Sequence, residues 1–121
     1  MAKTILVVDD SDTIREAVQA ILNEAGYATK SADHGVSALQ VLAQGKVDLI
    51  ITDLNMAVMG GMELIQKVRA DGINKYTPIL MLTTEANQDK KMEGKAAGAT
   101  GWIVKPFKPD VLLATVAKVL R

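Results

Sequence analysis

Short apolar runs alternate with longer amphipathic stretches along this chain. The clearest apolar runs are Ile5–Val8, Leu49–Thr52, Ile79–Leu82 and Trp102–Val104. Runs of this length, bounded by polar or turn residues, are typical of buried parallel strands. A weaker run near Tyr27–Ser31 fits a strand at the edge of a sheet. The pattern therefore predicts five strands in one parallel sheet.

Helices are expected between the strands, because large apolar side chains recur there at helical spacing. Ser11 or Asp12 would cap the first helix and Asp33 the second, which would end at Gly45. Pro109 suits the first turn of the last helix. Together these units predict the α/β class and a flavodoxin-like (βα)5 three-layer sandwich, with a five-stranded parallel sheet in the strand order 2-1-3-4-5.

Size and composition fit one globular domain. The chain has 121 residues, 49% of them hydrophobic, and equal numbers of basic and acidic side chains, 14 of each. Without a basic excess, neither a nucleic-acid partner nor a membrane partner is expected. Cysteine is absent, which excludes disulfides and thiolate metal sites. We recognise no signal peptide and no membrane-spanning stretch, so we expect a cytoplasmic single domain over residues 1–121 without an output domain.

Polar residues stand where four of the predicted strands end. Asp9 and Asp10 follow the first strand, Asp53 the third, Thr83 the fourth and Lys105 the fifth. The carboxyl ends of strands in an open parallel sheet form the ligand crevice. We therefore expect three carboxylates, a hydroxyl and an ammonium group to converge at one edge of the sheet.

This set of groups suits metal-assisted phosphoryl chemistry. Clustered carboxylates raise one another's pKa unless a cation lies among them, and Mg²⁺ prefers carboxylate, water and phosphate oxygens. Asp53, at the centre of the expected sheet, is the candidate nucleophile for an aspartyl phosphate. Lys105 and Thr83 would contact phosphoryl oxygens. Each residue alone would more often be a cap, a turn former or a solvated side chain, but their joint placement favours one site.

The chain resembles the receiver domains of two-component response regulators, most closely the CheY-like single-domain chemotaxis type. The resemblance rests on four stretches, residues 5–11, 53–61, 82–85 and 98–107, and it covers the whole chain in order. It implies a signalling switch that accepts a phosphoryl group from a sensor histidine kinase or a small donor such as acetyl phosphate. Such a receiver is not an enzyme in the usual sense, because it catalyses only its own phosphorylation and dephosphorylation.

The resemblance also implies a role for each residue of the site. Asp53 would be the phosphoacceptor. Asp10 and Asp53 would bind the Mg²⁺ cofactor directly, together with the backbone carbonyl of Asn55, and Asp9 would act through a coordinated water. Lys105 would contact the phosphoryl group.

A switch is implied by two further positions. Thr83 would move toward the phosphoryl group, and the ring of Trp102, at the position of the family's switch aromatic, would then turn inward. A partly buried aromatic with no switch role is the alternative for Trp102. The coupling would be a shift between two populations.

Four positions would set the rates of the reaction. Asn55 and Glu85 stand at positions that modulate phosphorylation and hydrolysis. Ala57 replaces the usual proline, which would leave the acceptor loop less rigid. Thr84 is larger than the residue common there and would narrow the access to Asp53.

The fourth helix, fifth strand and last helix form the face that this family uses for partners. Lys91, Lys95, Trp102 and Lys118 would lie there and meet an acidic downstream target such as a flagellar motor switch component. Each lysine would equally suit a simple solvated face. We expect a monomer.

Two other classes of function remain open from the sequence. A small phosphatase of the haloacid dehalogenase type also uses an aspartate nucleophile with Mg²⁺, but Asn55 replaces its usual second aspartate, the general acid. A nucleotide-binding module would need a glycine-rich loop after the first strand, where this chain has acidic residues.

Overall fold

The computed structural model describes residues 2–56, 58–70, 72–84 and 88–120. The strands are β1 (Thr4–Val8), β2 (Ala28–Ala32), β3 (Leu49–Asp53), β4 (Ile79–Thr83) and β5 (Gly101–Val104). The helices are α1 (Asp12–Glu24), α2 (Gly35–Ala43), α3 (Gly61–Ala70), α4 (Gln88–Ala97) and α5 (Pro109–Leu120). Of the described helices, none has the length and apolar character needed to cross a membrane.

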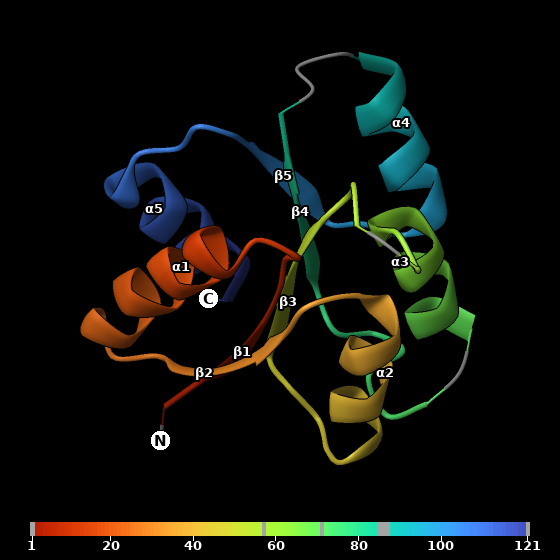
Figure 1. Ribbon diagram of the computed structural model, residues 1–121, viewed down its shortest axis with the longest axis horizontal. Helices are drawn as coiled ribbons and strands as arrows, with labels where there is room; N and C mark the ends of the chain where they lie inside the picture. Colours follow the sequence, from red (N-terminus) through yellow and green to blue (C-terminus); the bar gives the residue numbers. More distant parts are fainter. Residues whose placement is uncertain (1, 57, 71, 85–87, 121) are drawn as a thin grey trace.

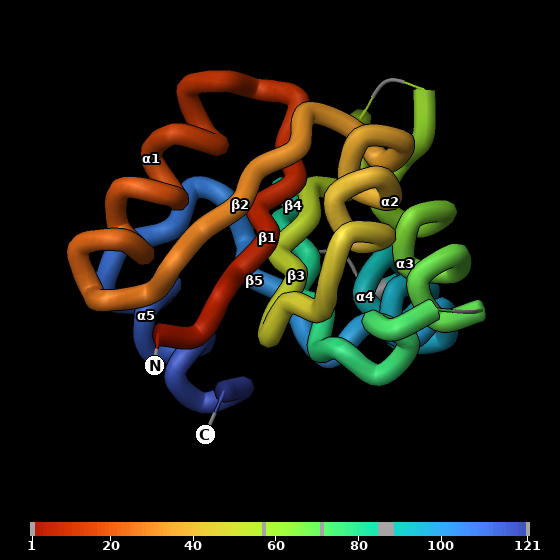
Figure 2. The backbone as a smooth tube through the Cα atoms, turned by 90° about the horizontal axis from the view of Figure 1, so that it is seen from below, coloured from red at the N-terminus to blue at the C-terminus, as the bar shows by residue number. Residues whose placement is uncertain are grey.

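The strands form one parallel sheet with helices on both faces. Their order is β2-β1-β3-β4-β5, and every neighbouring pair is parallel, as the sequence predicts. α1 and α5 cover one face, and α2, α3 and α4 cover the other (Figure 1). The view from below separates the same two groups of helices (Figure 2). The three-layer (βα)5 prediction is therefore confirmed.

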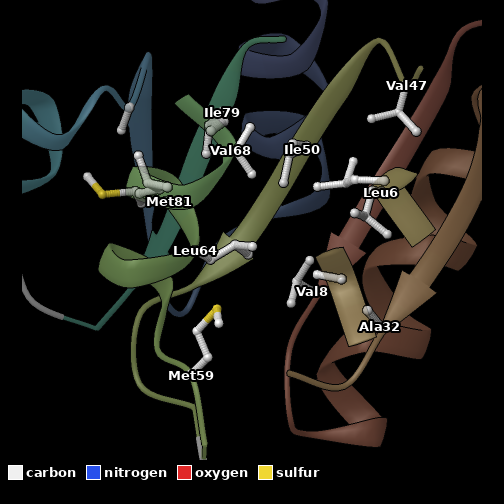
Figure 3. Packing of buried hydrophobic residues seen from close by; sticks show 14 of the residues in the cluster. Leu6, Val8, Ala32, Val47, Ile50, Met59, Leu64, Val68, Ile79 and Met81 are labelled. Carbon is white, nitrogen blue, oxygen red and sulfur yellow. The ribbon is translucent and has the colours of Figure 1, made fainter. Parts of the chain in front are cut away.

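Each face of the sheet carries its own hydrophobic core, because successive side chains of a strand point to opposite faces. The core beneath α2 and α3 is shown in Figure 3; its strand residues include Leu6, Val8, Ile50, Ile79 and Met81. The opposite core lies against α1 and α5; its strand residues include Ile5, Val7, Ile51, Leu82 and Ile103. This alternation continues past the strand ends and decides which face each site residue joins.

The start of α2 differs from the prediction. Asp33 does not cap this helix; His34 does, with its Nδ1 accepting a hydrogen bond from the Ser37 amide at 3.2 Å. The Asp33 carboxylate instead accepts from the Ser37 hydroxyl at 2.7 Å, and this bond lowers the pKa of Asp33. The helix also ends at Ala43, before the predicted Gly45. For α1, Ser11 is the cap, as expected.

Candidate functional site

Strand alternation brings Asp9, Asp53 and Lys105 to the same face of the sheet. Each stands two residues after a strand residue of the core beneath α1 and α5, namely Val7, Ile51 and Ile103. Neighbouring strands are in register, with Val7 opposite Ile51. The three side chains therefore leave adjacent parts of one edge in the same direction.

The ammonium group of Lys105 lies between two of the carboxylates. Its Nζ is 3.2 Å from Oδ2 of Asp9 and 3.3 Å from Oδ1 of Asp53. The backbone amide of Lys105 donates to the carbonyl of Thr83 at 2.8 Å, which ties the start of this loop to the end of β4. The sequence predicted that Lys105 joins the site, but its contact with Asp9 was not anticipated.

Asp9 is buried and each of its carboxylate oxygens has a partner, whereas Asp10 is exposed. Oδ1 of Asp9 accepts from the amide of Ser11 at 2.9 Å, and Oδ2 contacts Lys105. The backbone carbonyl of Asp9 accepts from the guanidinium of Arg15 at 2.7 Å. Sequence reasoning missed Arg15, although its position one turn into α1 could have indicated a contact with the preceding loop.

The carboxylate of Asp53 is held by the backbone that follows it. Oδ1 accepts from the amide of Leu54 at 2.9 Å, and the carbonyl of Leu54 accepts from the amide of Gly61 at 3.0 Å. A β-carbon on Gly61 would lie only 2.3 Å from the backbone oxygen of Asp53. Glycine at this position therefore lets α3 begin directly against Asp53.

The electrostatics of the site call for a cation. Asp9, Asp10 and Asp53 each offer a carboxylate oxygen, and these oxygens lie within 4.8 Å of one another. Burial raises the pKa of Asp53, and the Asp9 charge adds to this rise, while the Lys105 ammonium opposes it. Three carboxylates against one ammonium group leave an excess of negative charge. A hard divalent cation with oxygen ligands such as Mg²⁺ fits this donor set.

The remaining predicted site residues fall into three places. Thr83 is buried at the end of β4, and its side chain belongs to the opposite face of the sheet, in line with Ile79 and Met81. Thr84 and Asn55 are exposed and follow the ends of β4 and β3, the end of the sheet at which the three carboxylates lie. The predicted rate-modulating positions Ala57 and Glu85 lie outside the described residues.

The residues predicted for a partner face lie on α4, β5 and α5. The Trp102 side chain is 37% exposed, and the Nζ of Lys91 lies 4.9 Å from its ring centroid. A hollow of about 700 Å³ lies beside this ring, and Lys95, Lys118 and Tyr76 are among the residues that line it. Trp102 is thus a half-exposed ring with lysines around it.

Comparisons with known proteins agree with this geometry. Residues 5–117 match the response regulator receiver domain family. Chemotaxis protein CheY of Pseudomonas aeruginosa is 41% identical over 118 residues, which cover 97% of this chain and 95% of that protein. A high-resolution structure of the chemotaxis response regulator CheY4 of Vibrio cholerae has a TM-score of 0.95 and 49% identity, and the match covers 99% of this chain and 100% of that chain.

A third relative is described with a metal. The receiver domain of a sensor histidine kinase from Pseudomonas aeruginosa has a TM-score of 0.91 and 25% identity, covers 99% of this chain and 98% of its own, and has a magnesium ion coordinated in its active-site cleft. None of these matches supports the phosphatase alternative. The chain belongs to the response regulator receiver domain family, and its similarity to CheY is consistent with two-component chemotaxis signalling.

Proposed function

We propose that this chain is a switch that accepts a phosphoryl group on Asp53 from a sensor histidine kinase in a Mg²⁺-dependent reaction. The observation that carries the proposal is the position of the Lys105 ammonium, in contact with both Asp9 and Asp53 at a cluster of three carboxylates. In this arrangement the Asp53 carboxylate would supply the nucleophile, and the Lys105 ammonium would supply positive charge for the transferred group.

The contacts of Asp53 suggest which of its oxygens reacts. The Leu54 amide and the Lys105 ammonium both contact Oδ1, so we assign the attack to Oδ2. In the transfer, Oδ2 forms a bond to phosphorus while the phosphorus–nitrogen bond of the donor phosphohistidine breaks. The electron pair of that bond goes to the imidazole nitrogen, which then takes up a proton. After the transfer, the Lys105 ammonium would contact a phosphoryl oxygen instead of the Asp53 carboxylate.

The metal ligands we propose are the oxygens of Asp10 and Asp53 and the backbone carbonyl of Asn55. When bound there, Mg²⁺ would neutralise charge shared by the acceptor and the phosphoryl group. Both oxygens of Asp9 already have partners, the Ser11 amide and the Lys105 ammonium. This occupancy supports an indirect role for Asp9 through a coordinated water.

The switch would couple a movement of the Thr83 side chain to a movement of the Trp102 ring. Thr83 pairs in register with Val104, and Met81 with Trp102, so Thr83 and Trp102 present their side chains on the same face two positions apart along the sheet. When Thr83 turns toward the phosphoryl group, the ring of Trp102 can occupy the space it leaves. This inward turn would separate the ring from Lys91, which it contacts in the structure.

The output of the switch would be a protein target bound by the face on α4, β5 and α5. Lys95 and Lys118 line the hollow beside Trp102 and favour an acidic segment, such as one from a flagellar motor switch component. The proposed setting is the cytoplasm, with the chain acting as a monomer. Thr84 and Asn55, together with Glu85 and Ala57, would set the rates of phosphorylation and hydrolysis.

Intact-mass measurement after incubation with acetyl phosphate and Mg²⁺ tests the proposed function. The parent chain should gain the mass of one phosphoryl group, and Asp53→Asn should gain none. Chelation of Mg²⁺ should prevent the gain in the parent. Equal phosphorylation of Asp53→Asn, or an unchanged reaction after chelation, would refute the proposal.

A further inference from the structure

We propose that the end of the molecule opposite the carboxylates carries a second docking surface, which binds an acidic amphipathic segment of a partner protein. It is formed by Ile73 and Tyr76, from the loop between α3 and β4, with the lysines Lys46, Lys67 and Lys75; we call it the basal surface. Figure 1 shows this loop on the lower side of the view, whereas the segments after β1 and β3 leave the sheet on the upper side. The inference does not depend on phosphorylation of Asp53.

Two large apolar side chains project from this loop into solvent. Ile73 is 61% exposed and Tyr76 is 86% exposed. The value for Tyr76 is the highest among the large hydrophobic side chains in the part of the chain that the structure describes. They are neighbours on one short loop, which Figure 2 shows running from α3 to β4 at the lower edge of the molecule. Exposed apolar groups that cluster in this way commonly mark a binding site.

Hydrogen bonds of two buried side chains hold the loop that carries Ile73 and Tyr76 in place. Asn74 is buried and donates to the carbonyls of Leu42 and Gly45, both at 3.1 Å, while its Oδ1 accepts from the Val47 amide at 2.9 Å. Buried Thr77 donates to the same Oδ1 at 3.0 Å. A loop fixed in this way keeps Ile73 and Tyr76 outside at little entropic cost on binding, which favours recognition.

Two hollows flank the Ile73 side chain, and their shape favours a chain segment. One, of about 320 Å³, lies between α2 and α3 and is lined by Leu39, Leu42 and Lys67 among others. The other, of about 190 Å³, reaches from Ile73 to Tyr76 and Lys46. A helix or extended segment can place side chains in both hollows, whereas a flat bilayer surface would leave them unfilled.

The charges around the hollows determine the chemistry of the partner. Lys46, Lys67 and Lys75 are exposed around the apolar residues, and the Nζ of Lys75 lies 5.6 Å from the ring centroid of Tyr76. Among the described residues that line the two hollows, Asp48 is the one carboxylate, and it accepts a hydrogen bond from the Thr4 amide at 2.7 Å. The complement is a segment with leucine-like side chains on one side and carboxylates on its edges.

A titration of the full ¹⁵N-labelled chain with a synthetic helical peptide, leucine on one face and glutamate on its flanks, tests this inference. Amide shifts should centre on residues 72–78 and on the adjoining ends of α2 and α3. Ile73→Ser should weaken binding by about tenfold or more, as for loss of an anchor residue. Tyr76→Ala should weaken it as well, but Tyr76 also lines the hollow beside Trp102, so Ile73→Ser is the variant that identifies the basal surface. Both side chains are largely exposed, so the variants are expected to fold, and their spectra will show it.

Matched control variants separate binding at the basal surface from binding elsewhere on the chain. Lys67→Glu should weaken the binding of the peptide, whereas Lys30→Glu, an exposed lysine on β2, should not. Asp53→Asn should bind as the parent does, so failure of the phosphorylation proposal leaves this one standing. Shifts centred on Trp102, equal binding of a peptide with lysine in place of glutamate, Ile73-dependent self-association, or Ile73-dependent binding to phosphatidylserine vesicles without peptide binding would each overturn it.

Discussion

The ammonium group of Lys91 lies 4.9 Å from the ring centroid of Trp102, and this contact joins α4 to β5. A cation over an aromatic ring contributes about 0.5–1 kcal/mol at an exposed site. In the proposed switch, an inward turn of the ring would break this contact. The contact would therefore favour the outward conformation of Trp102, and it links a helix of the proposed partner face to the proposed switch residue.

Lys91→Gln should shift the switch toward its inward state. Loss of about 0.5–1 kcal/mol from the outward state corresponds to a change of about two- to fivefold in the equilibrium. The concentration of beryllofluoride, a phosphoryl mimic, that gives half of the Trp102 fluorescence change should fall by that factor. Lys30→Gln removes the same charge from β2, at the opposite edge of the sheet from Trp102, and should leave it unchanged. An increase in the Lys91→Gln variant would contradict this interpretation.

Lys105→Met should bind Mg²⁺ more tightly while losing most of its phosphorylation. The ammonium contacts two of the proposed site's carboxylates and repels a cation there. Unit charges about 5 Å apart interact by roughly 3 kcal/mol at an effective dielectric constant of about 20, so we expect affinity to rise by at least about tenfold. Calorimetric titration measures it, with exposed Lys108→Met as the control. Unchanged affinity would show that Lys105 does not compete with the metal.

Asp53→Asn should be more stable than the parent at pH 7 without Mg²⁺. Burial raises the pKa of Asp53 above its ordinary value of 3.8, so stability falls as the pH rises from 3.8 through the folded-state pKa, and the full loss remains above it. The neutral amide removes that penalty, and the melting temperature should rise.

The pH dependence of this gain is the sharper measurement. As the pH falls through the raised pKa of Asp53 toward 3.8, the parent's carboxyl takes up a proton and the difference between the two proteins should vanish. Glu16→Gln, at an exposed position on α1, should show no such difference. A lower melting temperature for Asp53→Asn at pH 7 would mean that the contact with Lys105 outweighs burial.

The buried strands could be predicted from the sequence because their signal is local. An apolar run such as Ile79–Leu82 is buried on both faces, so its composition alone indicates its place in the sheet. The start of α2 could not be located in the same way. Asp33 and His34 are both able to cap a helix, and the path of the chain after β2 decides which side chain reaches the Ser37 amide.

The sequence predicted that the polar residues at the strand ends converge, but it did not predict most of their mutual contacts. The alternation of strand side chains would have placed Asp9, Asp53 and Lys105 on one face, and this signal was available in the sequence. Arg15 contacts the loop just before its own helix, which its position could have indicated. Asn74 instead donates to the carbonyl of Leu42 near the end of α2, distant in the sequence, and no residue pattern identifies such a partner, because it depends on how these segments meet in the folded chain.

Gly61→Ala should destabilise the fold and disturb the acceptor. Helix propensity alone predicts a gain of about 0.5–1 kcal/mol for alanine in a helix. The new β-carbon, however, would lie 2.3 Å from the Asp53 carbonyl oxygen and 2.9 Å from the Cα of Leu54, both backbone atoms. We expect a net loss of about 1–3 kcal/mol in urea unfolding. A β-carbon on Gly45 would meet nothing within 4 Å, so the control Gly45→Ala should lose no stability.

Asn74→Ala should destabilise the chain more than any exposed asparagine does. The change removes one acceptor and one donor that together serve the Val47 amide, the Thr77 hydroxyl and the carbonyls of Leu42 and Gly45. A buried group left without its partner costs about 1–3 kcal/mol, so several such groups should lower the free energy of unfolding by at least about 3 kcal/mol.

The effect of Asn74→Ala should also be local to the loop before β4. Asn23 is an exposed asparagine that accepts a hydrogen bond from Thr29, and Asn23→Ala should lower stability by about 1 kcal/mol at most. Amide hydrogen exchange should quicken first at residues 45–47 and 74–78 in Asn74→Ala, because the side chain joins these two loops. If exchange quickened equally throughout the sheet, Asn74 would support the whole fold, and the rigidity of the basal surface would need another source.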